Sequence, residues 1–428
     1  MSETATDAAP RGIPRSRDLA LRAIPAVIIG VLSAVVLWAL ETVAHALQHG
    51  LWEAVPAALG FAGDSWWWIF AVLTLTGVAV GLVVWLVPGH GGQDSATVEL
   101  VAPVQPLRAL PGITAVILLA LAGGVSLGPE SPIIAINTAL AVALLARITP
   151  GAPRELTITV TASATIGAMF GTPVAAALLF TGLLAAQRGG SLWDKLFLPV
   201  TAAGAGALTT LFLGGPLVAL KLPAYDSPSP LDLLTGTAVA LLGAAIAIVA
   251  TVLFPLAHRL FHSLRHPMIY IPLGGVILGV LGVLGGPLTL FKGLTEMGEL
   301  VREASTVTIV QLVVIVGVKV LALVVSASSG FRGGRIFPSV FVGVGVGMLG
   351  NLLIPAVPLA LAIACGVLGV ILVIARDGWL ALFLAVAVCG QIATLPVLCL
   401  VVLPVWLLAR KAPEMIVHVP AEAEPATR

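Results

Sequence analysis

The stretch Gly128-Pro129-Glu130-Ser131-Pro132 lies inside a long apolar region, and Gly334-Arg335-Ile336-Phe337-Pro338 repeats its outline 206 residues later (128 to 334). Glycine and proline break helices and release backbone groups, which a bilayer tolerates only where protein or water encloses the backbone. One such break in each half of a chain is typical of a substrate site built from broken helices. The predicted helix-break positions are Gly124, Gly128, Pro129, Pro132, Gly330, Gly334 and Pro338.

The composition predicts an integral membrane protein. Of 428 residues, 59% are hydrophobic and 10% are charged, whereas soluble domains carry about 25% charged residues. A formal net charge of +1 indicates no basic surface for nucleic acid. Arg15 and Arg17 precede the first apolar segment and Arg410-Lys411 follow the last, so both termini are expected in the cytoplasm and the chain in the plasma membrane, crossing it several times.

The fold class predicted is an all-α polytopic membrane protein made of two inverted-topology repeats of tilted and broken helices. Many apolar segments are shorter than the roughly 20 residues of a spanning helix and are separated by Gly or Pro. The most polar interior stretch begins at Pro216 and serves as the link between halves. The predicted divisions are a cytoplasmic tail (1–19), a first repeat (20–215), a linker (216–230), a second repeat (231–410) and a cytoplasmic tail (411–428).

Two helix starts that converge in mid-membrane would form an anion site, because each start exposes unpaired N–H groups and carries about half a positive charge. Glu130 lies at one of these starts, and a charged acid in hydrocarbon costs roughly 2.5–3.5 kcal/mol or more. Its carboxylate is therefore predicted to occupy the place of an anion and to act as a gate. The alternative is an acid that stabilises its own helix and meets water.

Other polar residues near the breaks have two interpretations each. Arg335 contacts the anion or extends to the membrane interface, and Arg332 is a vestibule cation or a solvated loop residue. The Ser131 hydroxyl contacts the ion or bonds back to a carbonyl of its own helix. A third break, Pro88–Ser95, brings His90 and Gly91 towards the same cavity or leaves His90 in solvent.

No metal site or cofactor is predicted. Glu41, His45 and His49 share a helix face, but their surroundings are typical of a membrane interface. The three cysteines, Cys365, Cys389 and Cys399, lie in apolar runs without the spacing of metal ligands. No nucleophile–base pair occurs either, so the chain is not expected to be an enzyme.

These motifs resemble those of the CLC family of chloride channels and proton-coupled anion antiporters, over about residues 20–410. The family's Gly-Lys/Arg-Glu-Gly-Pro motif resembles residues 128–132, its Gly-x-Phe-x-Pro motif resembles 334–338, its Gly-Ser-Gly-Ile-Pro loop loosely resembles 89–92, and its Phe-Asn-x-Pro-Leu-Ala pattern resembles 170–175. The resemblance implies a homodimer with one pore in each subunit and Glu130 as the gating glutamate. The anion-binding residues it implies are Ser131, Arg335, Ile336, Phe337, His90 and Gly91.

The chain departs from the family pattern at several of these positions. Pro129 replaces the basic residue, Ile336 stands where the motif has Phe, and His90 falls near the serine that contacts the central anion. The last tyrosine is Tyr270, so the family's anion-contacting tyrosine has no counterpart. The internal proton glutamate of the antiporters would fall near Gly182, where no acid occurs.

The function predicted is therefore transport of small monovalent anions, chloride first among them, through a passive CLC-like pore gated by Glu130. Membrane lipid and the anion are the expected partners, with no nucleic acid. Two alternatives stay open: proton/anion antiport, and secondary transport of another small solute.

Overall fold

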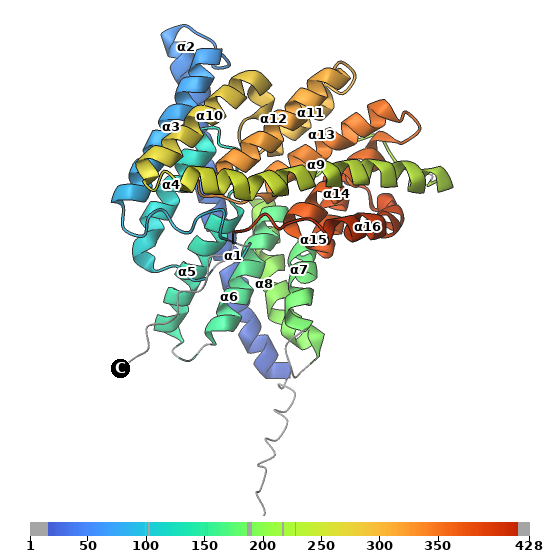
Figure 1. The fold of residues 1–428 in the computed structure, drawn as a ribbon. Helices are drawn as coiled ribbons and strands as arrows, with labels where there is room; N and C mark the ends of the chain where they lie inside the picture. Colours follow the sequence, from blue (N-terminus) through green and yellow to red (C-terminus); the bar gives the residue numbers. More distant parts are fainter. Residues whose placement is uncertain are drawn as a thin grey trace, which may run out of the picture.

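The computed structural model describes residues 16–98, 100–101, 103–149, 151, 153–185, 191–215, 218–226 and 228–417, and this part of the chain consists of helices joined by turns and loops, with long connections between α3 and α4 and between α8 and α9 (Figure 1). Nine of the helices found there are long and apolar enough to cross a membrane. Shorter apolar helices lie between them, as the Gly/Pro breaks predict. The described residues form no strand; two of them, Gly128 and Gly334, make one isolated bridge. The all-α class is confirmed.

Eight α-helices precede the interval between Phe212 and Pro230, and eight follow it in the described part of the chain. In the first half they are α1 (Ser16–His49), α2 (Val55–Leu59), α3 (Trp66–Leu86), α4 (Leu110–Ala122), α5 (Glu130–Ile148), α6 (Arg154–Phe170), α7 (Pro173–Ala185) and α8 (Leu192–Phe212). In the second they are α9 (Pro230–His262), α10 (Pro267–Gly285), α11 (Leu294–Arg302), α12 (Ile309–Ser328), α13 (Ile336–Leu353), α14 (Leu359–Ala375), α15 (Gly378–Cys389) and α16 (Leu395–Ala409).

The 206-residue offset of the sequence extends through the helices that follow the breaks. Helices α5 to α8 start close to 206 residues before α13 to α16. The turns that precede them match in conformation, because Gly124 and Gly330 adopt left-handed φ angles of 87° and 86°. Side chains rarely adopt such angles, which explains glycine at both positions. Helix α8 ends at Phe212 and α9 begins at Pro230, so the predicted linker (216–230) lies between them except for its last residue, which begins α9; residues 216, 217 and 227 are outside the described part.

Helix α13 lies at the centre of the protein. Of its membrane-length window 83% is buried, against 33–56% for the other candidate spans. Glycines allow this close packing: a Cβ on Gly343 would lie 2.5 Å from Val367 Cα, and one on Gly347 would lie 2.3 Å from Ile363 Cα, both on α14. The helix that follows the second break is therefore enclosed by protein and not by lipid.

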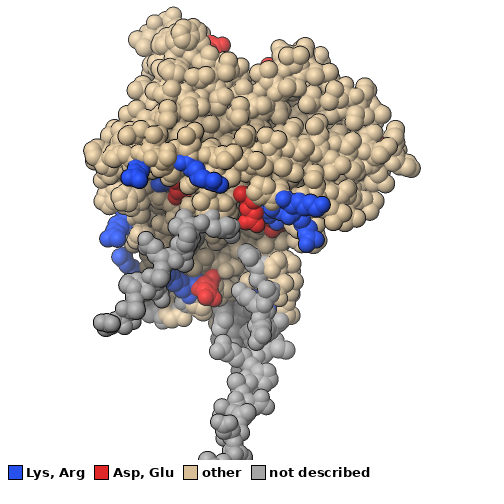
Figure 2. Space-filling view, in the orientation of Figure 1, with Lys and Arg blue, Asp and Glu red and all other residues tan. Residues whose placement is uncertain are grey.

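Charged side chains are unevenly distributed over the surface. In the view of Figure 2, Lys and Arg gather in the lower part of the molecule, below a broad uncharged surface. Helix α1 begins on this same lower side, and helices α5 to α8 lie there, below α13 and α14 (Figure 1). The uncharged zone is what contact with hydrocarbon requires, since charged side chains there are costly.

Candidate functional site

The two Gly/Pro breaks lie side by side. The Gly128 N–H donates to the Gly334 carbonyl at 2.8 Å, and the Gly334 N–H donates to the Gly128 carbonyl at 2.7 Å. Helices α5 and α13 both begin directly after this exchange, at Glu130 and Ile336. The predicted convergence of the two broken segments is confirmed, and we call residues 128–132 and 334–338 together the junction.

Glu130 is fully buried within the junction. Its Oε1 accepts a hydrogen bond of 2.8 Å from the Phe337 N–H at the start of α13, while Oε2 has no hydrogen-bond partner among the described residues. A Cβ on Gly128 would lie 2.2 Å from Oε2, and one on Gly334 would lie 1.9 Å away. The carboxylate therefore fills space that only glycines leave open, at the positive end of a helix from the other half. It does not meet water as a simple acid of its own helix.

A cavity of about 290 Å³ opens on one side of Glu130. Its wall includes three predicted site residues, Ser131, Arg335 and Ile336, beside Glu130 itself. The Arg335 Nη2 donates to the Val98 carbonyl at 2.8 Å, which holds this guanidinium against the loop that follows α3. Further from Glu130 the wall carries Arg376, Asp377 and Glu414, and the Asp377 carboxylate accepts from the Leu380 N–H at 2.8 Å as the cap of α15.

A second cavity, of about 280 Å³, is lined by the next residue of α13, Phe337, together with Glu41, Thr42, His45 and Thr210. Ile336 and Phe337 are adjacent in sequence and line different cavities. The peptide that binds Glu130 therefore lies where the two cavities approach each other. Glu130, which lines the first cavity, thus accepts a hydrogen bond from a residue that lines the second.

Lys292 is a functional candidate that sequence reasoning missed. Its Nζ lies 2.5 Å from Glu41 Oε1 and 5.9 Å from the centre of the Phe337 ring. The side chains of Lys292 and Glu41 are 10% and 16% exposed, so Glu41 is a largely buried ion-pair partner. The only sequence signal was a lysine in the apolar run PLTLFKGL.

A second buried lysine holds the segment that carries Lys292. The Lys319 ammonium on α12 is fully buried and donates to the carbonyls of Thr289, Leu290 and Phe291 at 3.1, 2.8 and 2.8 Å. These bonds satisfy the three ammonium protons, which burial would otherwise leave without partners. Lys319 thus positions the backbone next to Lys292.

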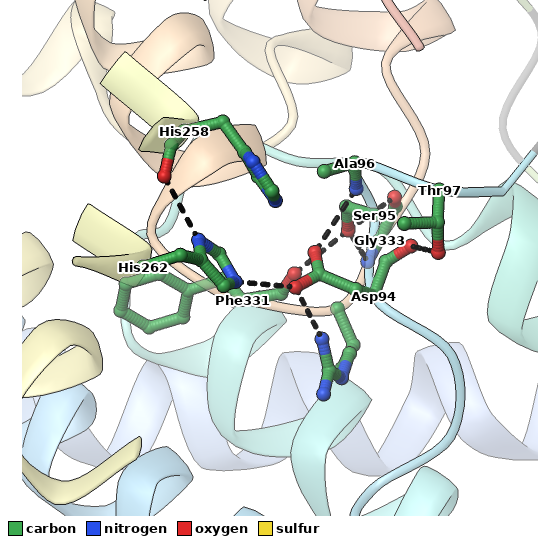
Figure 3. A network of polar contacts seen from close by, with 9 residues as sticks. Asp94, Ser95, Ala96, Thr97, His258, His262, Phe331 and Gly333 are labelled. Carbon is green, nitrogen blue, oxygen red and sulfur yellow. Dashed lines mark hydrogen bonds and ion pairs between the residues drawn. The ribbon is translucent and has the colours of Figure 1, made fainter. Parts of the chain in front are cut away.

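The third break packs against the second one through Ser95. The Ser95 Oγ lies 2.7 Å from the Phe331 carbonyl and 2.9 Å from the Gly333 carbonyl, and it accepts from the Gly333 N–H at 2.8 Å (Figure 3). Gly91 is buried nearby and shares a small cavity with Ser131. His90 is exposed, and its Nδ1 lies 2.9 Å from the Val84 carbonyl at the end of α3. The structure therefore brings Gly91 to the junction region but leaves His90 outside it.

Asp94 joins the third break to α9 and to the second break. Its Oδ2 lies 3.2 Å from His262 Nε2 and 3.3 Å from Arg332 Nη1. Burial acts to raise the pKa of this carboxyl, but Arg332 and the His262 hydrogen bond outweigh it and lower the pKa to about 2. Asp94, His258 and His262 also bring ligand-type atoms within 4.8 Å of one another, a grouping that could hold a metal ion.

Comparisons with known proteins agree with this architecture. The model of the family described as voltage gated chloride channel matches residues 75–409. YfeO of Escherichia coli, which is named as a candidate ion-transport protein, is 46% identical over 412 residues, covering 96% of this chain and 98% of the relative. YfeO of Escherichia fergusonii matches with the same identity and coverage.

Solved structures show the same fold at low sequence identity. A slow cyanobacterial Cl⁻/H⁺ antiporter has a TM-score of 0.77 at 17% identity, over 91% of this chain and 94% of that one. A CLC-type fluoride/proton antiporter has a TM-score of 0.69 at 18% identity, over 94% and 98%. These similarities confirm the predicted membrane fold.

Proposed function

Since the chain belongs to the voltage-gated chloride channel (CLC) family of multi-span anion transport proteins, we propose that its cargo is a small monovalent anion, chloride first among them, and that Glu130 is the gate. The observation that carries the proposal is the 2.8 Å hydrogen bond from the Phe337 N–H to the Glu130 carboxylate. That carboxylate occupies the anion place at the start of α13. An anion that passes between the two cavities must take its place.

The chemistry of this exchange follows from the helix start. Unpaired N–H groups and the helix dipole stabilise a negative charge by about 0.3–1 kcal/mol at exposed ends and up to about 2 kcal/mol in partly buried ones. Amides within residues 130–132 and 335–337 replace the hydration shell of the ion, apart from Pro132, which has no N–H. Protonation of Glu130 removes its negative charge and releases the place to the ion.

Lys292 supplies a cation near the Phe337 ring, which the proline at position 129 does not offer. Glu41 lines the second cavity and also a small neighbouring cavity in which Lys292 lies; in our proposal an anion that reaches Glu41 competes with it for this ammonium before it reaches Glu130. Beside Lys292, the Glu41 carboxylate occupies the position that the transported anion would take, as Glu130 does at the junction. Ser131, Arg335 and Ile336 line the first cavity and act from its side.

Conduction is proposed to be passive, because the segment FTGLLAAQ (180–187) contains no acid that could hand a proton to Glu130. One observation favours proton/anion antiport as a second candidate. Asp377 and Glu414 line the same cavity as Glu130, so a proton could approach it from that side.

The chain is further proposed to form homodimers with one pore in each subunit. Its termini are proposed to lie in the cytoplasm, in keeping with the basic residues on the side where α1 begins (Figure 2).

Flux from liposomes separates these candidates. Purified protein is reconstituted with equal chloride on both sides, and a proton gradient is imposed. Passive conduction produces no net chloride movement under zero voltage, whereas antiport drives chloride uphill. If uphill movement occurs, Glu414→Gln should abolish it and Glu299→Gln, on the partly exposed α11, should not. Absence of chloride flux down an imposed chloride gradient, in either direction, contradicts the proposed function as a whole.

A further inference from the structure

A groove of about 290 Å³ runs between α1 and α5, apart from the cavities at Glu130. Its wall lies between residues 25 and 36 of α1 and between residues 137 and 149 of α5, and none of the described residues that line it is charged. Five of the wall residues are large, apolar and exposed: Ile28, Leu32, Leu140, Leu144 and Ile148. A contiguous patch of this kind marks a surface that contacts lipid or another protein.

The groove is about as long as one leaflet of a bilayer is thick. An α-helix rises 1.5 Å per residue, so the walls from 25 to 36 and from 137 to 149 span roughly 16 and 18 Å. The hydrocarbon core of a bilayer is about 30 Å thick, which leaves about 15 Å for each leaflet. A single acyl chain laid along the two helices therefore fits the groove from end to end.

The inner end of the groove is polar and fixes α5 to its neighbours. Asn137 is buried there, and its Nδ2 donates to the Ser33 carbonyl of α1 at 3.3 Å and to the Thr165 hydroxyl of α6 at 3.0 Å. Helix α5 also carries Glu130 at its start. An occupant of the groove thus packs against the helix that presents Glu130 to α13.

The outer end of the groove carries a cation. Arg147 lies in the last turn of α5, three residues after Leu144 and seven after Leu140, so it shares their face of the helix. It is exposed, and no acid in the described part of the chain pairs with it. An arginine at a helix end extends to the membrane surface, where its guanidinium binds phosphate through two parallel hydrogen bonds.

This outer end lies on the basic side of the molecule. Residue 25 is close to the start of α1, and residue 149 directly follows the end of α5. Both helices reach the lower side in Figure 1, where Lys and Arg gather in the view of Figure 2. The groove therefore runs from the membrane surface on that side into the hydrocarbon.

An anionic phospholipid matches both ends of the groove, whereas other occupants match one. A neutral lipid fills the apolar walls but leaves Arg147 without an anion, and a free phosphate binds Arg147 but leaves the walls empty. A second copy of the chain, related by two-fold symmetry, would place this patch against itself. The two Arg147 side chains would then lie on the same side of one interface, and the walls hold no acid to separate them.

We propose that the groove between α1 and α5 binds one anionic phospholipid, with an acyl chain along the apolar walls and its phosphate at Arg147. The lipid comes from the leaflet on the side where α1 begins. Because α5 forms one wall, the bound lipid stabilises the helix from which Glu130 projects. This site is separate from the path of the transported anion, and its occupancy is measured without flux.

Lipid retention by the full chain in detergent, followed by native mass spectrometry, tests the proposal. The probes are dioleoylphosphatidylglycerol and dioleoylphosphatidylcholine, which have the same acyl chains and differ in net charge. The wild type should retain one phosphatidylglycerol per chain and bind it about fivefold more tightly than phosphatidylcholine, as one basic residue near a lipid surface provides. Arg147→Gln should remove this preference, and Arg410→Gln, at the exposed end of α16, should keep it.

A bulky side chain in the groove tests its walls. Ala141 lines the groove, so Ala141→Phe should abolish retention of both lipids. Ala146 is exposed on another face of the same helix, and Ala146→Phe should match the wild type. Glycerol 3-phosphate, which has the phosphate without the chains, should not displace the bound lipid.

Three results overturn the proposal: retention that Ala141→Phe leaves unchanged, equal affinity for the two lipids in the wild type, or a change of oligomeric state in Ala141→Phe, which would make the groove a subunit interface. If Ala141→Phe does not fold, Arg147→Gln at its exposed position still decides through the ratio of the two affinities. A liposome assay without chloride flux would contradict the proposed function and leave the lipid result standing.

Discussion

Gly128 and Gly334 exchange two backbone hydrogen bonds, of 2.8 and 2.7 Å, although they are 206 residues apart in sequence (128 to 334). This exchange joins the two halves at the point where α5 and α13 begin. It also explains how Glu130, from the first half, reaches the Phe337 N–H of the second. Any change in the relative position of the halves therefore changes the bond that holds the proposed gate closed.

Gly334→Ala should displace the Glu130 carboxylate sterically and so open the gate. The new Cβ would lie 1.9 Å from Glu130 Oε2, so the carboxylate has to leave its place at α13. We expect anion flux at neutral pH to rise towards the level that the wild type shows at acidic pH, with a loss of thermal stability. Gly317→Ala, in α12 with open space around its Cα, serves as the control and should leave both properties unchanged. Flux and stability equal to the wild type would contradict the placement of the carboxylate.

Glu130→Gln should give flux that no longer depends on pH. The amide oxygen can still accept from the Phe337 N–H, but the side chain carries no charge at any pH and so resembles the protonated gate. Chloride efflux from liposomes measured from pH 4.5 to pH 8 provides the test, with Glu299→Gln as the control for the loss of one acid. A pH profile that stays like that of the wild type removes Glu130 from the gating role.

Lys292→Met should impair both folding and anion capture. Removal of one partner leaves the largely buried Glu41 carboxylate without its counter-ion, and breaking a buried pair costs about 3–5 kcal/mol. The double variant Lys292→Met/Glu41→Gln should recover most of the free energy of unfolding but should still carry less anion, because the cation next to Phe337 is missing. Lys221→Met, in an exposed loop, is the control. Recovery of full flux in the double variant would show that Lys292 acts only in stability.

The charge of Asp94 should make the free energy of unfolding depend on pH in the acid range. Its pKa is lowered from 3.8 to about 2 in the folded state, so its contribution is complete above pH 3.8 and is lost as the pH falls through about 2. A shift of this size corresponds to roughly 2 kcal/mol. In gluconate, Asp94→Asn should be less stable than the wild type by about this amount at pH 6, and the difference should vanish near pH 2. Asp64→Asn, in an exposed loop, should show no such difference, and a constant deficit at every pH would contradict the role of the Asp94 charge.

Local chemistry was sufficient to predict the membrane class, the broken helices and the acid. Hydropathy marks apolar segments directly, and glycine and proline act on the backbone where they stand. Gly124 and Gly330 carry the left-handed turns that their shared spacing indicates. The meeting of residues 128–132 with 334–338 was predictable as well, because a repeated pattern brings equivalent breaks to one interface.

The side chains that complete the site were not predictable in the same way. Lys292 reaches Glu41 across 251 residues, and Ser95 reaches Gly333 across 238. A hydrogen bond depends on ångström distances between segments that no local pattern relates. His90 shows that a motif match can also indicate the wrong residue. It falls on the family's loop motif, yet its ring contacts the Val84 carbonyl. Ser95, five residues later, is the residue that contacts the second break.

Composition and the placement of Gly, Pro and one Glu thus determined by themselves that this chain enters a membrane, breaks its helices at Gly and Pro, and holds an acid at one of these breaks. The tertiary structure decided which helix start that acid binds and which lysine lies near the Phe337 ring. It also decided which arginine has buried donors without hydrogen bonds to described residues. The physical reason is that backbone preference and hydrophobicity act within a segment. Charge pairing and hydrogen bonding depend on the positions of segments relative to one another.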